Sequence, residues 1–413
     1  MIIVHKRPSR FLALFYVLLV VLGSFSLIHG WFPQLYRLVF LCFGIVMVSV
    51  VLVPRFFLSG TFVFIFLYAC VVYINYSWGD IYTEGKEYLD GLVLASCASM
   101  AYYFAKTDDQ KNKCRLFFVS FVIILVDMIG TLTMYLVNPE IVRFAQGLAN
   151  GGDNVSTLEY YKFGLVEYDV LHGFPVLISP LVMWIRHRET RKKWRFIAWS
   201  GLVIIFVLLY ISDATMPFLL AILALLLSFL VVKNNHRKSV RRFFIAGMIA
   251  LPFLLFSSSL KMGVLNIAYS ITGGELQNKI DDFRQMSKSG EMEGDVDIRF
   301  QLYTISFQQF LRNPIIGTDN VDTRVGHSSV IDRLGAFGLL GIIPWVLVFV
   351  FITRFNYKYL PYKARDFYLI GVFCFAFMLL LKNMSYFYTW YSFAVLMPCM
   401  CSLNVCDKRS RNV

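Results

Sequence analysis

Long apolar runs alternate with short polar stretches along this chain. Most runs have about 18–22 residues, which is the length that a helix needs to cross the hydrocarbon core of a bilayer, and the shortest have 16. We expect each of the twelve runs to form a membrane-spanning helix, over residues 11–28, 35–53, 56–74, 88–105, 116–137, 165–185, 196–211, 213–232, 243–259, 330–352, 367–382 and 386–404. The pattern predicts an all-α, polytopic membrane protein with a single transmembrane domain over residues 1–413.

Three connections between these runs are longer than the others and cover residues 75–87, 138–164 and 260–328. Long connections without a span of their own are usually functional. The last one separates the ninth and tenth spans. It predicts an amphipathic helix over about residues 298–312, because four aromatic residues recur there at spacings of three and four: Phe300, Tyr303, Phe307 and Phe310. We expect this helix to lie along the membrane surface or to cap the bundle.

The composition supports the membrane class and excludes several others. Of the 413 residues, 58% are hydrophobic and only 16% are charged, whereas about a quarter of the residues of a soluble domain are charged. Disordered, fibrous and secreted disulfide-rich classes do not fit these values. The eight cysteines fall in predicted spans or at their edges, so neither a disulfide framework nor a metal site is expected. The first apolar run is interpreted as a transmembrane helix and not as a signal peptide.

The net charge of +13 follows the predicted topology. With the N-terminus inside, the cytoplasmic pieces hold 26 of the 39 Lys and Arg residues but only 5 of the 26 Asp and Glu residues. The positive-inside rule therefore predicts that both termini are cytoplasmic and that the three long connections are external. Because the basic residues report orientation, no nucleic-acid partner is expected.

One external segment has the pattern of an anion-binding site. Ser329 and Asp332 form a capping-box pattern for a helix that starts near residue 330, and His327 lies just before it. Arg324 and Arg333 are close in sequence. A helix start offers free N–H groups and the positive end of a dipole, which suit an anionic group such as a diphosphate. Such a place also favours a neutral imidazole, the form that a general base needs.

A second interpretation of this segment is purely structural. In it, Arg324 and Arg333 pair with Asp322 and Asp332, and His327 is a surface residue at the membrane boundary. The residues alone leave both interpretations open.

A wider pattern around this segment resembles the superfamily of O-antigen polymerases and O-antigen ligases. The matching residues are Arg299, Tyr303, Phe307, Phe310, Asn313-Pro314-Ile315-Ile316-Gly317, His327-Ser328-Ser329, Leu334-Gly335 and Gly338-Leu339-Leu340-Gly341. In that family an arginine opens an external amphipathic helix, an Asn-Pro-x-x-Gly turn follows, and a histidine precedes a glycine-rich span. The chain departs from the family where Ser328 replaces a frequent Asn, where Thr318-Asp319 follows Gly317, and where Ser212-Asp213 replaces a frequent Ser-Arg.

The resemblance implies a GT-C-like fold and glycosyl transfer on the outer face of the bacterial cytoplasmic membrane. The donor would be a glycan on undecaprenyl diphosphate, and no metal or other cofactor would take part. His327 would be the base or the group that orients the acceptor, and Arg299 a cation that binds the diphosphate. Arg324 and Arg333 are candidates by position only. A polysaccharide chain-length regulator is a plausible partner in this family.

Two further groups of residues are candidates for substrate binding. Arg143 lies in the external connection 138–164, where family members commonly place a functional arginine. It could equally be an interfacial residue whose side chain extends so that its charge stays in water. Glu167, Asp169 and His172 lie in the outer part of the sixth span. Ionisable groups inside a span usually face a cavity or a partner, so these three either bind sugar hydroxyls or pair with Lys162 or with Lys382 at the outer end of another span.

Four functions are therefore compared. The first is polymerisation of lipid-linked repeat units for O-antigen or capsule, which the phenylalanine-rich composition favours slightly, and the second is ligation of a finished glycan to a lipid A core. The third is a metal-dependent glycosyltransferase, which usually needs acidic residues in its first external connection, where residues 29–34 have none. The fourth is a flippase or transporter, which would have less external mass than residues 260–328 provide.

Overall fold

A computed structural model describes most of the chain. It covers residues 10–24, 26–31, 34–78, 88–107, 109–140, 159–187, 190–212, 214–231, 295–318, 328–382 and 387–403, with the single positions 142, 238, 242, 277 and 281. Within these residues the chain is helical, and no β-strand occurs in them. The prediction of an all-α fold is confirmed.

The described helices follow the predicted spans closely. They are α1 (Arg10–Ser24), α2 (Ser26–Trp31), α3 (Gln34–Leu52), α4 (Gly60–Trp78), α5 (Tyr88–Lys106), α6 (Gln110–Val137), α9 (Tyr168–Arg186), α10 (Lys192–Ile211), α11 (Thr215–Leu230), α15 (Asp295–Arg312), α16 (Ser329–Tyr359), α17 (Arg365–Leu381), α18 (Phe387–Tyr391), the π-helical η4 (Ser392–Leu396) and α19 (Met397–Ser402). The short 3-10 turns η1 (Pro54–Phe56) and η3 (Tyr362–Ala364) precede α4 and α17. The ninth predicted span, residues 243–259, lies outside the described residues.

Length and hydropathy identify these helices as membrane-spanning. Five described helical segments are long and apolar enough to cross a bilayer: α6, α9, α10, α16 and the segment Tyr362–Leu381. Shorter apolar stretches occur in α3, α4 and α11. The structure is thus that of a polytopic membrane protein, as the alternating runs predicted.

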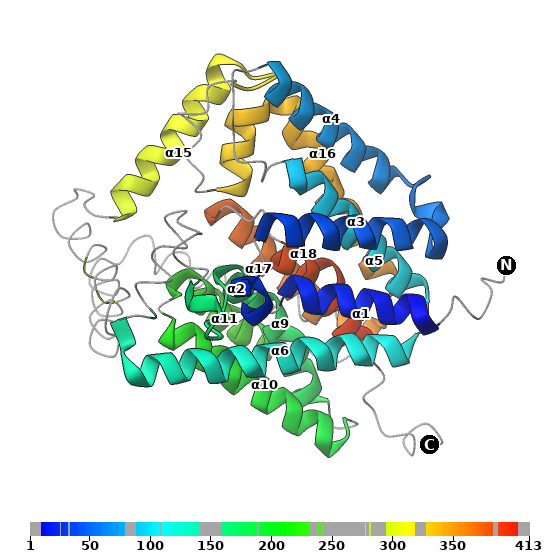
Figure 1. Cartoon of the computed structure of the whole chain (residues 1–413), viewed down its shortest axis with the longest axis vertical. Helices are drawn as coiled ribbons and strands as arrows, with labels where there is room; N and C mark the ends of the chain where they lie inside the picture. Colours follow the sequence, from blue (N-terminus) through cyan, green and yellow to red (C-terminus); the bar gives the residue numbers. More distant parts are fainter. Residues whose placement is uncertain are drawn as a thin grey trace.

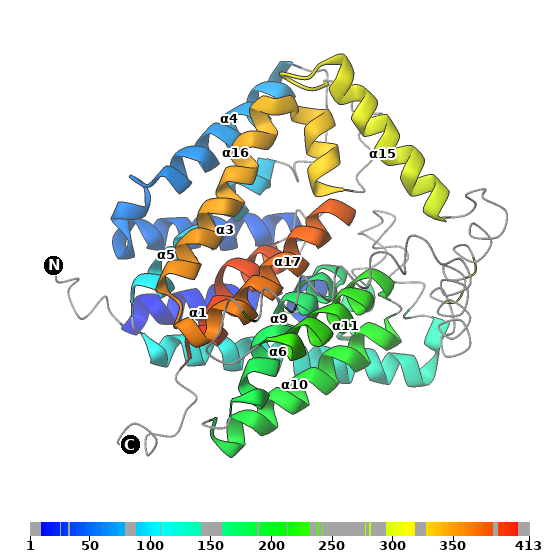
Figure 2. The same cartoon turned by 180° about the vertical axis from the view of Figure 1, so that it is seen from behind.

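The bundle is arranged around α9, which contacts α10, α11, α17 and α18. The side chains of α9 are buried on all sides over most of its length, and they include the ionisable Asp169 and His172. On the other side of the molecule α16 packs along α4, and α15 leans outward from the start of α16 (Figures 1 and 2).

Two ends of the bundle can be distinguished by charge. At the basic end, α5 and α16 terminate and α6 and α10 begin, and their terminal turns carry lysines: Lys106, Lys111, Lys113, Lys192 and Lys358. At the opposite end, α6 and α17 terminate and α9 and α16 begin, and α15 lies on this side (Figure 1). The candidate site residues that the structure describes belong to the opposite end.

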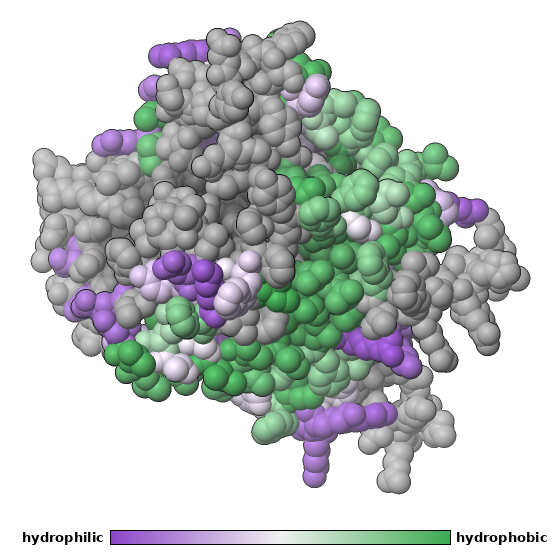
Figure 3. Space-filling view, in the orientation of Figure 1, coloured by the Kyte–Doolittle hydropathy of each residue, from purple (hydrophilic) through white to green (hydrophobic). Residues whose placement is uncertain are grey.

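The outer surface of the bundle is apolar between these two ends. Hydrophobic side chains gather across the middle of the face shown in Figure 3, and hydrophilic ones lie mainly toward its sides. Large apolar side chains of several spans are exposed, among them Phe40, Val51, Leu136, Phe196 and Val203. Exposed apolar area on this scale indicates contact with lipid tails, because water would make it costly.

Candidate active site

The glycine-rich span α16 is broken near its start, where the sequence pattern predicts one continuous helix. Gly338 has φ of 57° and ψ of −160°, so the helix is interrupted there and continues in a new direction. A new helix start leaves backbone N–H groups without intrahelical partners. Two of them are satisfied from outside the helix: Leu339 N donates to Pro314 O (2.9 Å) and Leu340 N donates to Ile315 O (3.1 Å). The Asn-Pro-x-x-Gly turn therefore caps the second half of α16.

This docking requires glycine at two positions of the pattern. A Cβ atom on Gly338 would lie 2.5 Å from the Ile315 carbonyl oxygen, and one on Gly317 would lie 2.3 Å from the Ala336 carbonyl oxygen. Both residues also have positive φ, at 57° and 87°, which L side chains rarely adopt. The turn and the break thus fit each other only because neither glycine has a side chain.

The first half of α16 begins with a capping box that is shifted by one residue from the predicted one. The N-cap is Ser328, not Ser329, and its Oγ accepts a hydrogen bond from Ile331 N (3.1 Å). In return, Asp332 Oδ2 accepts one from Ser328 N (2.6 Å). The serine that replaces the family's frequent asparagine after His327 therefore starts the helix.

The start of α16 is held against the end of α17. Ser328 Oγ donates to Leu380 O (2.7 Å), and Ser329 N donates to Lys382 O (2.9 Å). Both serines are fully buried. These bonds satisfy carbonyl groups that the last turn of α17 leaves without intrahelical donors, and they fix the position of the residue that follows His327.

Helix α15, predicted to be external, joins the same assembly. Tyr303 OH donates to Leu381 O (3.0 Å), and Ser306 Oγ donates to Asp332 Oδ1 (2.9 Å). Gly335 permits the close approach of the two helices, since a Cβ atom there would lie 2.6 Å from the Ser306 carbonyl oxygen. α15, the start of α16 and the end of α17 thus form one hydrogen-bonded unit, which we call the clasp.

The apolar side of α15 does not pack against the bundle. The residues of α15 that are buried are small or polar, namely Ser306 and Gln309. Exposed apolar side chains continue from α15 through the turn: Phe307, Leu311, Ile315 and Ile316. This surface has the character of a membrane-contacting face, in accord with a helix that lies along a lipid surface.

Lys382 brings a positive charge to the clasp. Its Nζ donates to Tyr168 OH (3.0 Å) and lies 5.7 Å from the centroid of the Tyr168 ring. The ring of the same tyrosine is tilted by 54° against that of His172, with 4.2 Å between the ring centroids, and His172 Nδ1 is 2.7 Å from Tyr168 O. The start of α9 therefore lies beside the end of α17 and the start of α16.

The three predicted residues of α9 are all buried near this junction. Asp169 accepts hydrogen bonds from Tyr388 N (2.9 Å) and from Thr389 Oγ1, and so caps the first turn of α18. Glu167 is the N-cap residue of α9, and His172 lies in its second turn. The structure brings Glu167, Asp169 and His172 together, and it gives Asp169 a helix-capping role besides the predicted binding role.

Arg333 is the one predicted arginine whose side chain is described. It forms an ion pair with Asp90 of α5, donates through Nε to Tyr68 OH (3.0 Å), and donates through Nη1 to Ser329 O (3.1 Å). Its guanidinium also lies 5.0 Å from the centroid of the Trp345 ring. Arg333 is thus enclosed by protein groups that neutralise it, which favours a positioning role. The ion pair with Asp90 joins α16 to α5.

The remaining predicted residues are placed only in part. Arg299 lies in the first half of α15, one helical turn before Tyr303. His327, Arg324 and Arg143 lie outside the described residues, so their roles stay predictions. In the described part of the chain no three His, Cys, Asp or Glu side chains form a group suited to a metal ion.

Sequence reasoning gave Lys382 only the role of a partner for acidic residues. A signal for it exists nevertheless, because a lysine at the predicted external end of a span opposes the positive-inside trend and is costly in the membrane. Tyr168 and Ser328 gave no comparable signal, since their contacts depend on how three helices meet.

Comparison with known families fits this geometry. The fold and the clasp define a polytopic membrane protein with its candidate site at one end of the bundle. A family model described as O-antigen ligase matches residues 200–320, a stretch that includes α11, α15 and the turn that caps α16. The match confirms the resemblance to the superfamily of O-antigen polymerases and ligases, and it supports a membrane enzyme that acts on glycans. No curated protein matches the chain.

Proposed function

We propose that this protein is a polymerase of undecaprenyl-diphosphate-linked oligosaccharide repeat units, for O-antigen or capsular polysaccharide, on the outer face of the bacterial cytoplasmic membrane. The observation that carries the proposal is the clasp. In the clasp, hydrogen bonds join α15 and the start of α16, which both carry the family's pattern, to the end of α17. This unit lies at the end of the bundle that the charge distribution predicts to be external.

The proposed reaction is one glycosyl transfer. A hydroxyl group of the acceptor repeat unit attacks the anomeric carbon of the donor glycan, and the bond between that carbon and the diphosphate oxygen breaks. Undecaprenyl diphosphate leaves with the electron pair of the broken bond, and the acceptor proton passes to a base. The enzyme has to hold two lipid-linked substrates, offset the charge on the diphosphate and accept that proton.

The residues suit these tasks as follows. His327, directly before the N-cap residue Ser328, accepts the proton or orients the acceptor. Arg299 of α15 and Lys382 at the end of α17 bind the diphosphate, and the proposal adds Lys382 because it brings a positive charge to the clasp. Arg324 and Arg143 remain candidates for the same task.

The acidic residues and the apolar surface complete the proposal. Glu167, Asp169 and His172 form a buried polar group beside Lys382 that offers hydrogen bonds to sugar hydroxyls. The exposed apolar residues of α15 and the turn after it let the external unit rest in the lipid layer that carries both polyprenyl substrates. No metal is assigned to this reaction.

The test is polymerisation by purified protein in detergent, with undecaprenyl-diphosphate-linked repeat units and without added metal. A ladder of products spaced by one repeat unit is expected. His327→Ala is expected to abolish the ladder, while His187→Ala, the same change at the basic end, leaves it intact. Arg299→Ala is expected to lower the rate by at least about a hundredfold, and Arg312→Ala, at the exposed far end of α15, serves as its control.

The family match gives one specific reason to test a second function, because its model is described as O-antigen ligase. The same assay is therefore repeated with a lipid A core as acceptor. Transfer of a whole glycan to that core, with no ladder in its absence, would replace the polymerase by the ligase. Folded protein without product in either assay would favour a flippase or transporter. A His327→Ala variant with a normal product ladder would instead overturn the assignment of the site.

The proposal includes an orientation and a partner. Both termini and the basic end are assigned to the cytoplasm, as the lysine and arginine distribution predicts. A chain-length regulator would act beside the polymerase and shift the length distribution of the ladder when added.

A further inference from the structure

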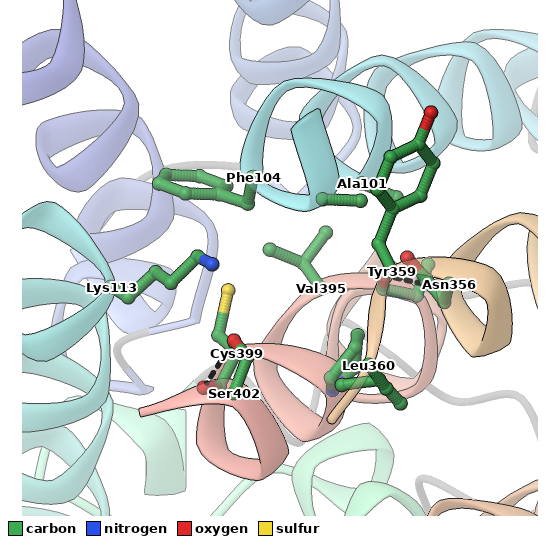
Figure 4. A pocket seen from close by; sticks show the side chains of 12 residues that line it. Ala101, Phe104, Lys113, Asn356, Tyr359, Leu360, Val395, Cys399 and Ser402 are labelled. Atoms are coloured by element: carbon green, nitrogen blue, oxygen red, sulfur yellow. Dashed lines mark hydrogen bonds between the residues drawn. The ribbon is translucent and has the colours of Figure 1, made fainter. Parts of the chain in front are cut away.

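The basic end of the bundle contains a recess that the catalytic proposal does not use. It encloses about 300 Å³ between α5, α6, α16, η4 and α19, including the part that opens outward. Figure 4 shows the recess from close by. Its lining comes from the last turns of α5, α16 and α19 and from the start of α6, so it lies at the end of the bundle remote from the clasp.

A lysine side chain points into this recess. Lys113 of α6 is only 5% exposed, and its ammonium group extends from α6 toward Cys399 of α19 (Figure 4). No hydrogen bond or ion pair joins this ammonium to another residue of the described part of the chain. The nearest carboxylate along the helix, Asp109, accepts instead from Asn112 N (3.1 Å) and Tyr103 OH (3.2 Å). A buried lysine without a carboxylate partner is rare in proteins, since burial disfavours the charge.

The recess also presents negative ends of helices. α5, α16 and α19 all terminate around it, and the last carbonyl groups of a helix carry a partial negative charge. Tyr359 and Ser402, each the last or nearly the last residue of its helix, are lining residues. One cation and the C-terminal ends of three helices therefore border the same small volume.

Most of the rest of the lining is apolar, and Asn356 is a polar exception whose amide donates to Ala394 O. The apolar side chains include Ala101, Phe104, Ala105, Leu360, Val395 and Pro398. Lysines outside the recess, among them Lys106, Lys111 and Lys358, are exposed and follow the same membrane boundary. A ligand that fits must combine a phosphate for Lys113, an ammonium for the carbonyl groups and an apolar part at the edge of the bilayer.

We propose that this recess binds the headgroup of an aminophospholipid, with Lys113 holding the phosphate and the helix C-termini holding the amine. A glycerol headgroup offers the same phosphate without the ammonium, so it should bind less well. Basic pockets between helices at the cytoplasmic boundary are a known type of lipid-headgroup site. The proposal is independent of the reaction at the clasp.

The experiment measures lipid binding by the purified protein after removal of co-purified lipid. Phosphatidylethanolamine, phosphatidylglycerol and inorganic phosphate are added separately, and bound lipid is counted by native mass spectrometry alongside the apparent unfolding temperature. Phosphatidylethanolamine is expected to bind and to raise the apparent unfolding temperature by several degrees. Phosphatidylglycerol is expected to have a smaller effect, and inorganic phosphate none.

Variants connect the binding to the recess. Lys113→Met is expected to weaken binding of phosphatidylethanolamine by about tenfold or more, the scale of a lost charge-assisted hydrogen bond. Lys113→Arg keeps the charge and should retain most of the binding. Lys111→Met, an exposed lysine on the same turn of α6, should behave like the unmodified protein. Ala101→Leu fills the recess without changing its charge, and it should also weaken binding.

Three outcomes would overturn the proposal. The first is equal stabilisation by the two lipids, since the helix C-termini would then select nothing. The second is stabilisation by inorganic phosphate to the same extent as by lipid. The third is undiminished lipid binding in both Lys113→Met and Ala101→Leu, which would place the lipid elsewhere on the bundle.

Discussion

Two buried cations, one at each end of the bundle, have opposite surroundings. Arg333, near the clasp, is 6% exposed and is enclosed by Asp90, Tyr68 and Trp345. Lys113, at the basic end, is 5% exposed and faces a recess, with no ion pair to any described residue. A buried charge with a full set of protein partners holds helices together, whereas one that faces a cavity is suited to a ligand. Whether a buried cation has protein partners is therefore a better guide to ligand binding than how close the cation lies to a predicted site.

The largest expected effect on stability comes from removing the charge of Arg333. Arg333→Met leaves Asp90 buried without its cation, and such a change typically costs about 3–5 kcal/mol. We expect a large fall in the apparent unfolding temperature of the detergent-purified protein and loss of polymerisation. The double variant Arg333→Met/Asp90→Asn removes both charges and should recover much of the stability. A single variant as stable as the unmodified protein would contradict a positioning role for Arg333.

The break in α16 tests whether the clasp depends on backbone shape as well as on charge. Gly338→Ala adds a Cβ atom 2.5 Å from the Ile315 carbonyl oxygen at a residue with φ of 57°. Positive φ at a residue other than glycine costs about 1–3 kcal/mol, and the close approach adds to it. Thermal unfolding and the product ladder should both be impaired.

Its control is Gly60→Ala, at the start of α4, where an added Cβ atom meets nothing within 4 Å. That change should leave stability and activity nearly unchanged. Equal behaviour of the two variants would show that the turn over residues 313–317 does not need its present fit to α16.

A smaller loss of stability is expected when the N-cap residue of α16, next to His327 in the sequence, is replaced. Ser328→Ala removes the side chain that caps α16 and bonds to Leu380 O, and loss of an N-cap costs about 1 kcal/mol. Ser59→Ala removes a comparable bond at the start of α4, where Ser59 Oγ accepts from Phe62 N (3.3 Å). Both variants should lose similar stability, but only Ser328→Ala should slow polymerisation. A normal rate in Ser328→Ala would separate the cap from the active site.

The smallest effect on stability is expected when Lys113 is replaced. Replacing a buried charge by an apolar side chain of similar volume is often neutral or stabilising. Lys113→Met should therefore change the free energy of unfolding in lipid-free detergent by less than about 1 kcal/mol. A loss as large as that of Arg333→Met would show that Lys113 is a structural partner of the helix C-termini, and the contrast between the two cations would fail.

Most of the fold could be predicted from the chain because membrane spans are encoded locally. A run of apolar residues long enough to cross the bilayer must form a helix, since the hydrocarbon offers no other partner for its backbone. The predicted spans accordingly coincide with α3, α5, α6, α9, α10 and α17 within a few residues. The external helix at about residues 298–312 likewise overlaps α15 (Asp295–Arg312).

The candidate site could be predicted only in outline. The spacing of Gly317, Gly335 and Gly338 in the family's pattern points to this segment, and glycines repeated along a span usually indicate close helix packing. That interpretation suits Gly335, which approaches α15, and not Gly338, where the helix breaks. A break cannot be read from hydropathy, because the residues on either side of it remain apolar.

The sequence by itself determined the class of protein, the spans, their expected orientation and the segment that resembles a glycan-polymerising family. Each of these depends on residues near one another in the chain. Only the tertiary structure decided that Arg333 is paired with Asp90, that Lys382 meets Tyr168, and that Lys113 faces a recess. Those outcomes depend on contacts between helices far apart in sequence, where burial, and not residue type, decides whether a charge has a partner.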